Sequence, residues 1–386
     1  MRILVLSYYY PPDIGPGSLR AKSIVDALIK EGPSDLKIDV ITTMPNRYHS
    51  LNISALKKEF NSKININRIN LPKHKNGIID QSIAFILFSF GVRKIISKKK
   101  WDIVIATSSR LLTASLGSWI AKKNDSKLCL DIRDLFTDTI YSIFKKKIRI
   151  LMPLLYILEK WTYRSADMIT LASPAFTDHI KKVSPKKSTF ICTHGIDELF
   201  LNTDFKIKKN KTSPLVLYSG NIGEGQGLHK ILPKMADEFQ DIQFKIIGDG
   251  SARKFLTNDR LLRSQKNIKI LNPMSRDKLF NEYRKADILF LHLNDYEAFN
   301  KVLPSKIFEY AATGKPILAG VSGYASKFLR EQVLGVQVFD PCDNVQMKFA
   351  LQKLLSGPKF FDRKKFFKIY SRHNIMKKVA KNIFLM

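Results

Sequence analysis

The sequence has few cysteines and lacks the cysteine spacing that holds a disulfide framework or a zinc ion. Its 386 residues contain only Cys129, Cys192 and Cys342, which lie far apart. None of them belongs to a CxxC pair or to a Cys/His cluster. Isolated cysteines of this kind are typical of small buried side chains in a reducing compartment. We therefore expect a cytoplasmic protein with no structural metal.

Long hydrophobic runs and a cleavable leader are also missing. The apolar segment 1–7 has no small-residue cleavage pattern, which indicates a buried strand and not a signal peptide. Residues 78–92 are strongly apolar but include Asp80, Gln81 and two serines. This stretch is shorter than the roughly 20 residues that cross a bilayer. We expect a buried or interfacial helix there.

Acidic residues are scarce: 34 Asp and Glu face 65 Lys and Arg, for a formal net charge of +31. Such an excess attracts polyanions, either nucleic acid or an anionic bilayer. A lysine-rich composition that serves only solubility is the alternative. No base-reading motif or single concentrated basic element supports nucleic acid as the partner. Basic runs instead stand beside apolar residues, at 98–101, 145–147 and 364–367.

Short apolar segments rich in Ile, Leu and Val alternate with helical stretches along the chain, which predicts parallel sheets covered on both faces. In the first half the predicted strands are 2–7, 38–42, 64–69, 103–106, 127–131 and 168–171. In the second half they are 215–219, 243–248, 268–271, 288–293 and 316–319. The fold class is therefore α/β, with two Rossmann-like, doubly wound units.

A polar, lysine-rich segment without periodicity, 202–213, precedes Pro214 and has the composition of a linker. It separates a predicted domain 1–200 from a second domain 214–365. A basic amphipathic helix, about 366–383 within the terminal segment 366–386, is expected to pack back on the first domain. Two such halves place an active site in the cleft between them, beyond the carboxyl ends of the strands.

Glycine-rich loops follow the first strand of each half. In the first loop, Gly15 and Gly17 precede a helix that starts near Ser18, whose free N–H groups favour phosphate. The second loop, 218–227, has four glycines but no GxGxxG spacing, which weakens a dinucleotide-dependent oxidoreductase. A third turn ends in Gly248 and Gly250, and Arg253 and Lys254 follow it as candidates for a diphosphate.

The segment 299–318 carries the densest set of candidate residues. Pro304 and Ser305 open a predicted helix, and Gly314 closes it. Glu309 lies four residues after Ser305, on the same helical face. A carboxylate there can accept both ribose hydroxyls of a nucleotide, while Lys306 in the first turn can meet phosphate.

The segments GPGSLR, GNIGEGQGL, IIGDG and PSKIFEYAATGKPIL resemble the retaining GT-B glycosyltransferases of family 4. They are most similar to the subgroup, including L-fucosamine transferases, that builds bacterial O-antigens and capsules. The resemblance covers essentially the whole chain. It implies two Rossmann-like domains facing each other across a cleft, a nucleotide-sugar donor, and neither a metal nor another cofactor.

The resemblance also implies roles for particular residues. Gly15 and Gly17 would lie near the donor diphosphate and the acceptor, and Glu309 would hold the ribose. The implied catalytic group, which meets the sugar and the diphosphate charge, is Gly17, Arg133, Asp134, Arg253 and Lys306. The other donor-binding residues are Gly220, Asn221, Gly223, Gln226, Gly248, Gly250 and Ser305.

Two features depart from the usual family pattern. Lys301 stands where the paired-glutamate motif has its first glutamate, and Asn221 and Gln226 stand where many members have an arginine and a lysine. The subgroup of closest resemblance shares these features, so we interpret them as variation within active enzymes.

The predicted reaction moves a sugar from a UDP-sugar, N-acetylated or 6-deoxy, onto a polyprenyl-diphosphate-linked saccharide with retention of configuration. Segments 78–100 and 141–161 combine apolar faces with basic residues, which suits peripheral binding to the anionic inner face of the plasma membrane. A GT-B nucleotide-sugar 2-epimerase is an alternative, and it would need a cleft histidine such as His194 or His292. A non-catalytic membrane- or nucleic-acid-binding protein is another.

Overall fold

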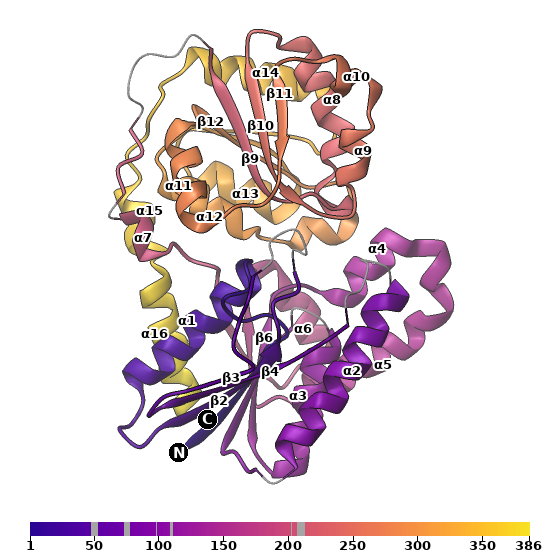
Figure 1. Ribbon diagram of the computed structural model, residues 1–386, viewed down its shortest axis with the longest axis vertical. Coiled ribbons are helices and arrows are strands. Elements are labelled where there is room, and N and C mark those ends of the chain that lie inside the picture. Colours follow the sequence, from indigo (N-terminus) through magenta and orange to yellow (C-terminus); the bar gives the residue numbers. More distant parts are fainter. Residues whose placement is uncertain (48–52, 73–77, 98, 109–110, 202, 207–212) are drawn as a thin grey trace. The chain divides into compact units, whose positions relative to one another are not determined.

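The structure is a computed structural model that describes residues 1–47, 53–72, 78–97, 99–108, 111–201, 203–206 and 213–386. Within helices, the side chains at 78–79 and 144–147 lie outside this description, as does most of the predicted linker. Contacts divide the chain into two compact units (Figure 1). Unit 1 comprises Met1–His194 and Arg372–Met386, and unit 2 comprises Gly195–Ser371.

Unit 1 contains an eight-stranded sheet of order β3-β4-β2-β1-β5-β6-β7-β8, parallel except where β3 meets β4. Central strands β1 and β5 are short apolar runs covered on both faces, as parallel sheets require. All six predicted strands are present, whereas the short edge strands β3 and β8 were not predicted. The strands are β1 (Arg2–Leu6), β2 (Lys37–Thr43), β3 (Lys58–Phe60), β4 (Ile64–Ile69), β5 (Ile103–Thr107), β6 (Lys127–Ile132), β7 (Met168–Leu171) and β8 (Ser188–Ile191).

The helices of unit 1 cover this sheet. They are α1 (Pro16–Glu31), α2 (Ile78–Ile96), α3 (Leu111–Asn124), α4 (Phe136–Ile148), η1 (Arg149–Leu151), α5 (Met152–Ser165), η2 (Pro174–Phe176), α6 (Thr177–Val183) and α16 (Arg372–Phe384). The terminal helix α16 packs beside α1 (Figure 1), where Met376, Val379 and Ile383 share a core with Ile24 and Leu28.

The single terminal helix predicted at 366–383 is wrong, because the chain forms two helices there. The first, α15 (Lys364–Ile369), belongs to unit 2, and α16 belongs to unit 1. Between them the Ile196 N–H donates to the Tyr370 carbonyl at 2.7 Å, and Ile196 pairs with Ser371 in an isolated bridge. This backbone pairing, which joins residues far apart in the sequence, replaces a helical turn.

Unit 2 contains a parallel six-stranded sheet of order β11-β10-β9-β12-β13-β14. One core unites its face with the helices α11, α12 and α13, and a second core unites the opposite face with α8 and α14. The five predicted strands are present, and β14 was not predicted. The strands are β9 (Leu215–Asn221), β10 (Gln243–Asp249), β11 (Ile268–Leu271), β12 (Ile288–His292), β13 (Ile317–Gly320) and β14 (Val336–Phe339).

The remaining helices belong to unit 2. They are α7 (Glu198–Leu201), η3 (Glu224–Gln226), α8 (Leu228–Glu238), α9 (Arg253–Thr257), α10 (Arg260–Ser264), α11 (Arg276–Lys285), η4 (Glu297–Lys301), α12 (Ser305–Ala312), α13 (Gly323–Gln332) and α14 (Asn344–Ser356). The helices α9 and α10 are separate, since Asp259 caps α10 by accepting the Leu262 N–H at 3.0 Å.

Both sheets reverse their strand order beside their first strand, at β1/β5 and at β9/β12. In open α/β sheets, ligands bind at such points, beyond the carboxyl ends of the strands. The glycine-rich loops after β1 and β9 start from these points. Across the described ranges, every helix is too short or too polar to cross a membrane.

Candidate functional site

Lys306 is held in the first turn of α12, close to the loop after β9. Its amine lies 5.8 Å from the ring centre of Tyr218 and 5.9 Å from that of Tyr310. A Cβ on Gly220 would collide with Cε and Nζ of Lys306. Only glycine at 220 therefore leaves room for the amine at the carboxyl end of β9. The structure thus brings the predicted residues Gly220 and Lys306 together.

Glu309 lies one turn further along α12, next to Ser305 and Lys306 at the helix start. The Tyr283 hydroxyl donates to its Oε2 at 3.3 Å and contacts Ser219 Oγ at 2.9 Å. Burial and the nearby Glu309 raise the pKa of Tyr283 well above its usual range, so the hydroxyl keeps its proton. This contact orients a partly buried carboxylate within one helical turn of an amine.

The side chains of Asn221 and Gln226 shape the glycine-rich loop itself. Asn221 Nδ2 donates to Gln226 Oε1 at 2.7 Å, and the Gly223 N–H donates to the same oxygen at 3.1 Å. A Cβ on Gly223 would lie 2.5 Å from Asn221 Nδ2, so a side chain at 223 would displace the Asn221 amide. The predicted residues Asn221, Gly223 and Gln226 are therefore one hydrogen-bonded unit.

Gly248 and Gly250 allow the end of β10 to lie directly against the loop after β9. A Cβ on Gly248 would collide with the Gly220 carbonyl oxygen, and one on Gly250 would lie 2.5 Å from the Ile222 carbonyl oxygen. Backbone atoms cannot move aside as a flexible side chain can. The two glycines thus let the two strand ends meet beneath the loop.

Arg253 begins the short helix α9, where its Nη1 donates to Asn272 Oδ1 at 2.5 Å. Its Nε is buried and has no hydrogen-bond acceptor among the described residues. Within the same residues, no hydrogen bond joins Arg253 to α12. The structure therefore brings together most of the predicted donor residues of unit 2, with Arg253 held separately against Asn272.

Residues at the carboxyl end of β12 hold the glycine-rich loop by hydrogen bonds, and the sequence prediction missed this function. His292 Nδ1 lies 2.6 Å from the Gln226 carbonyl oxygen, and Nε2 accepts the Cys342 N–H at 3.1 Å. The imidazole is thus a neutral tautomer that donates through Nδ1. Burial lowers the pKa of His292 to about 4. Both ring nitrogens are engaged by backbone groups, Nδ1 by the glycine-rich loop and Nε2 by the segment after β14, which leaves neither for acid–base chemistry.

Asn294 also holds the glycine-rich loop by hydrogen bonds. Its Nδ2 donates to the Glu224 carbonyl at 2.9 Å, and its Oδ1 accepts from Lys230 Nζ at 2.8 Å. Asn294 follows β12 directly, at the edge of the sheet where ligand loops gather. That position was the only sequence signal for it. The tyrosines 218, 283 and 310 gave none, because buried aromatic residues usually serve a core.

In unit 1 the predicted residues Gly17 and Arg133 are in contact at the start of α1. A Cβ on Gly17 would collide with Arg133 Nη1, and one on Gly15 would lie 2.8 Å from Arg47 Cδ. The first turn of α1 contains no acidic residue and no side-chain cap. Among the described residues, the buried atoms Arg133 Nε, Arg133 Nη1 and Ser18 Oγ have no hydrogen-bond partner. A helix start with unpaired buried donors suits an anionic oxygen.

Asp131, Arg133 and Asp134 differ in their surroundings although they are neighbours in the sequence. Asp131 is fully buried in an ion pair with Arg20, at 2.6 Å from Nη2 to Oδ1. Burial raises the pKa of Asp134, and the nearby Arg133 opposes that rise. Arg20 also donates to the carbonyls of Cys192 and Thr193 at 2.8 and 3.1 Å. Asp131 and Arg20 therefore form a structural pair.

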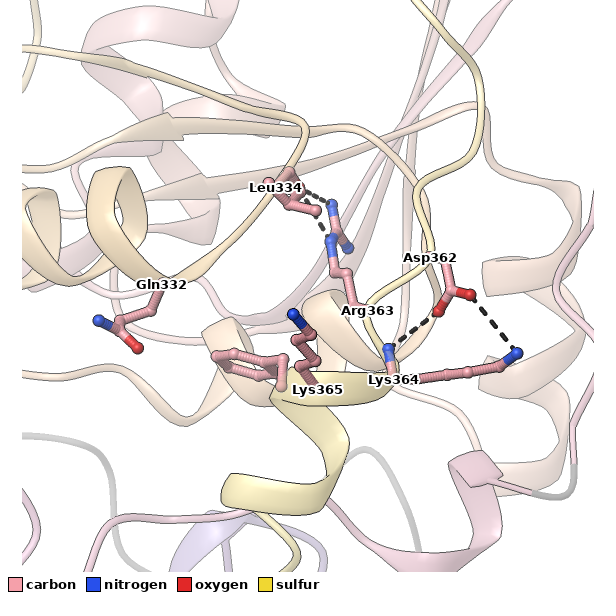
Figure 2. Close-up of a pocket in the computed structure, with 7 residues that line it drawn as sticks. Gln332, Leu334, Asp362, Arg363, Lys364 and Lys365 are labelled. Carbon is pink, nitrogen blue, oxygen red and sulfur yellow. Dashed lines mark hydrogen bonds and ion pairs between the residues drawn. The ribbon is translucent and has the colours of Figure 1, made fainter.

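Figure 2 shows a cavity of about 500 Å³ in unit 2 that has a different lining. Arg363 donates to the Leu334 carbonyl at 2.9 and 2.5 Å, and Lys364 pairs with Asp362 at 3.5 Å. Its arginine is thus satisfied by backbone carbonyls and one of its lysines by a carboxylate. No predicted site residue lines this cavity, whose lining is Gln332, Leu334, Asp362, Arg363, Lys364, Lys365 and Phe366.

The sequence predicts no metal site. Within the described ranges, no group of three or more His, Cys, Asp and Glu side chains is placed to hold a metal ion. The site described above consists of cations, loop N–H groups and one oriented carboxylate.

Comparison with known families gives a match in unit 2. Residues 200–373 match the model of the family described as Glycosyl transferases group 1. That range contains every predicted residue of unit 2. Over 102 residues the chain is 33% identical to WcaI of Escherichia coli K12, whose name assigns it to glycosyl transfer in colanic acid biosynthesis. This alignment spans 26% of the chain and a quarter (25%) of that relative's length.

Solved structures with the same fold cover the whole chain. Sucrose-phosphate synthase from Thermosynechococcus elongatus has a TM-score of 0.77 at 14% identity, covering 100% of this chain and 98% of its own. Anabaena HepE in complex with UDP-glucose has a TM-score of 0.68 at 14% identity, with 100% of both chains covered. A Listeria monocytogenes protein named for UDP-N-acetylglucosamine 2-epimerase has a TM-score of 0.57 at 14% identity, with 99% and 95% covered.

At these identities the likeness concerns the fold. It confirms the predicted α/β class with two Rossmann-like units, the fold of GT-B glycosyltransferases. The subgroup of L-fucosamine transferases stays a prediction.

Proposed function

We propose that this chain is a glycosyltransferase that moves a sugar from a nucleoside diphosphate to an acceptor hydroxyl during assembly of a bacterial surface polysaccharide. The observation that carries this proposal is the placement of Lys306 and Glu309 on α12. The amine of Lys306 lies against Gly220, and Tyr283 orients the carboxylate of Glu309 one turn away. The family match at 200–373 spans both residues.

In the proposed reaction, the bond from the anomeric carbon to the diphosphate breaks and a bond to the acceptor oxygen forms. The acceptor proton passes to an oxygen of the leaving diphosphate. Lys306 and the N–H groups of the glycine-rich loop stabilise the charge that grows on that diphosphate. Glu309 accepts the ribose hydroxyls. Arg253, Ser305, Gly248 and Gly250 complete the donor site of this proposal.

Unit 1 contributes the start of α1 and Arg133. The buried donors of Arg133 and Ser18 have no hydrogen-bond partner among the described residues. A bound phosphate or sugar oxygen would satisfy them, which lowers the cost of leaving them buried. Asp134 lies beside Arg133, where it can accept from a sugar hydroxyl. We assign Gly15, Gly17, Arg133 and Asp134 to the transferred sugar and the diphosphate.

We further propose a UDP donor with an N-acetylated or 6-deoxy sugar, retention of configuration as in family 4, and no metal cofactor. The UDP-glucose bound by Anabaena HepE supports a uridine nucleotide. The proposed acceptor is a polyprenyl-diphosphate-linked saccharide on the inner face of the plasma membrane. The +31 charge and the colanic acid relative support an acceptor at an anionic surface.

The likeness to a 2-epimerase keeps isomerisation as the second candidate. That reaction needs a histidine free to exchange protons, and both ring nitrogens of His292 are hydrogen-bonded to backbone groups. Burial and the nearby Arg20 and Arg133 lower the pKa of His194 well below its ordinary value. The engagement of both His292 nitrogens is the observation that favours the transferase.

The first test is thermal unfolding in the presence of UDP, GDP, ADP, dTDP, CMP or NAD. One nucleoside diphosphate should raise Tm in a concentration-dependent way, since a ligand at 100 times its Kd adds about 2.7 kcal/mol. Glu309→Gln should fold normally and bind that nucleotide about tenfold more weakly. The exposed Glu331→Gln is the matched control. A flat response, or normal affinity in Glu309→Gln, would contradict the proposal.

A further inference from the structure

The helix α5 in unit 1 exposes a row of apolar side chains that an ordinary surface helix would bury. Several of its large aliphatic side chains point to solvent: Leu154 is 63% and Ile157 65% exposed, and Ile150 of the adjoining η1 is 92% exposed. Leu151 and Trp161 extend this row. We name these five residues the apolar stripe. A surface helix of a soluble protein normally turns such a row towards its core.

The inward face of α5 buries Met152 and Tyr163 together with two hydrogen-bonded polar residues, Glu159 and Thr162. Glu159 is completely buried and accepts from the hydroxyls of Thr137 at 2.6 Å and Tyr163 at 3.2 Å. Its other oxygen lies 3.2 Å from His179 Nε2. Thr162 contacts Ser115 of α3 at 2.8 Å. These bonds tie α5 to α3, α4 and α6, so the helix cannot rotate to bury the apolar stripe.

Within η1 and α5, the exposed charged side chains are all positive. Arg149, Lys160 and Arg164 are exposed beside it, while Glu159, the one acid of η1 and α5, points inward. An exposed apolar row with a cationic margin is complementary to a surface that offers acyl chains beneath anionic headgroups. A protein partner would need to supply an apolar groove rimmed by acids.

We propose that η1 and α5 dock in the plane of an anionic phospholipid bilayer, with the apolar stripe at the level of the acyl chains and Arg149, Lys160 and Arg164 at the headgroups. Trp161 lies at the end of the apolar stripe, and indole rings favour the membrane interface. Docking of this kind brings unit 1 to a lipid-linked acceptor, and this catalytic role rests on the proposed function. The binding itself depends only on this surface.

The test is co-sedimentation of the full chain with vesicles of phosphatidylcholine alone or with 30% phosphatidylglycerol. The wild type should bind the anionic vesicles and lose binding in high salt. The variant Ile150→Ser/Leu154→Ser/Ile157→Ser should partition at least about tenfold more weakly, since each exposed side chain inserts apolar area. Because all three side chains are exposed, the variant should keep the wild-type Tm. Val345→Ser/Phe349→Ser, equally exposed on α14 of unit 2, is the matched control.

Two more measurements separate the outcomes. Trp161 emission should shift to the blue on anionic vesicles, and Trp161→Phe should lose most of that shift. Wild-type binding by the triple variant, or no vesicle binding by the wild type, would overturn the proposal. So would a wild-type dimer that the triple variant converts to monomer, because the apolar stripe would then join two copies. UDP-induced stabilisation, measured without vesicles, reports on the proposed function alone.

Discussion

At the scale of single residues, the candidate site depends on glycines that leave room for functional groups. Gly220 is followed by polar loop residues, and nothing local shows that it faces an amine on α12. The structure supplies that relation, because Lys306 occupies the volume that a side chain at 220 would need. Gly220 and Lys306 are 86 positions apart in the sequence. The need for glycine at 220 therefore arises from tertiary packing.

Gly220→Ala should displace the Lys306 amine and weaken nucleotide binding by about tenfold or more. Its φ of +144° adds backbone strain of about 1 kcal/mol, so a modest loss of stability should accompany the change. Calorimetric titration with the nucleotide selected above measures the affinity. Gly357→Ala is the control, because Gly357 follows α14 outside the candidate site and has a negative φ of −88°. Unchanged affinity in Gly220→Ala would separate Lys306 from the donor.

His292 makes the free energy of unfolding depend on pH. Its pKa is lowered from 6.5 to about 4 by burial, so the unfolded chain takes up a proton in a range where the folded site stays neutral. The contribution of His292 to the free energy of unfolding is therefore complete above pH 6.5. It is lost as pH falls towards 4, by about 3 kcal/mol in total. Urea unfolding of the wild type and of His292→Gln between pH 7 and pH 4 measures the difference. Parallel pH profiles for the two proteins would show that His292 is not the group responsible.

At the scale of elements, α1 is joined to the sheet by a buried ion pair. Arg20 binds Asp131 of β6 and the carbonyls after β8, and Thr170 of β7 adds a hydrogen bond to Asp131 at 2.7 Å. The pair therefore connects the helix that carries Gly17 to the strand that leads to Arg133. It also holds the chain shortly before His194, where unit 1 ends.

Arg20→Met should cost about 3–5 kcal/mol of stability, because it leaves the Asp131 carboxylate buried without its cation. Adding Asp131→Leu should recover part of this loss. Lys22→Met on the same helix breaks the exposed Lys22–Asp26 pair and should cost less than about 1 kcal/mol. Denaturant unfolding compares the three variants. Equal effects of Arg20→Met and Lys22→Met would exclude a structural role for the buried pair.

At the scale of the whole molecule, the two units differ in how the chain builds them. Unit 2 is one continuous segment, Gly195–Ser371, whereas unit 1 needs Arg372–Met386 to complete its core. Met376, Val379 and Ile383 are almost fully buried beside α1. Burial of three such side chains contributes about 5 kcal/mol.

Deletion of residues 372–386 should therefore lower the stability of unit 1 and leave unit 2 folded. Urea unfolding should then show two transitions, and UDP should shift one of them. Lys381→Ala, an exposed position on α16, should behave as the wild type. A single unshifted transition in the truncated chain would contradict the assignment of α16 to the core of unit 1.

The regular elements were readable from the sequence wherever apolar periodicity was strong. All eleven predicted strands are present, and the sequence omitted only β3, β8 and β14. Each of these is three or four residues long and partly exposed, so its pattern is too weak to separate it from a loop. The terminal helix was misjudged at Tyr370–Ser371, because a pairing with Ile196 decides its break.

The sequence by itself determined the α/β class, the two successive units, the basic surface and the loops that follow β1, β9 and β10, because these depend on local periodicity and on glycine. Only the tertiary structure decided which side chains meet. It joined Lys306 to Gly220, Gln226 to Asn221 and Arg133 to Gly17, and it assigned His292 and Asn294 to holding a loop. It also turned Glu159 and Thr162 of α5 inward. These relations depend on which elements pack together, a choice made by long-range contacts that local sequence does not contain.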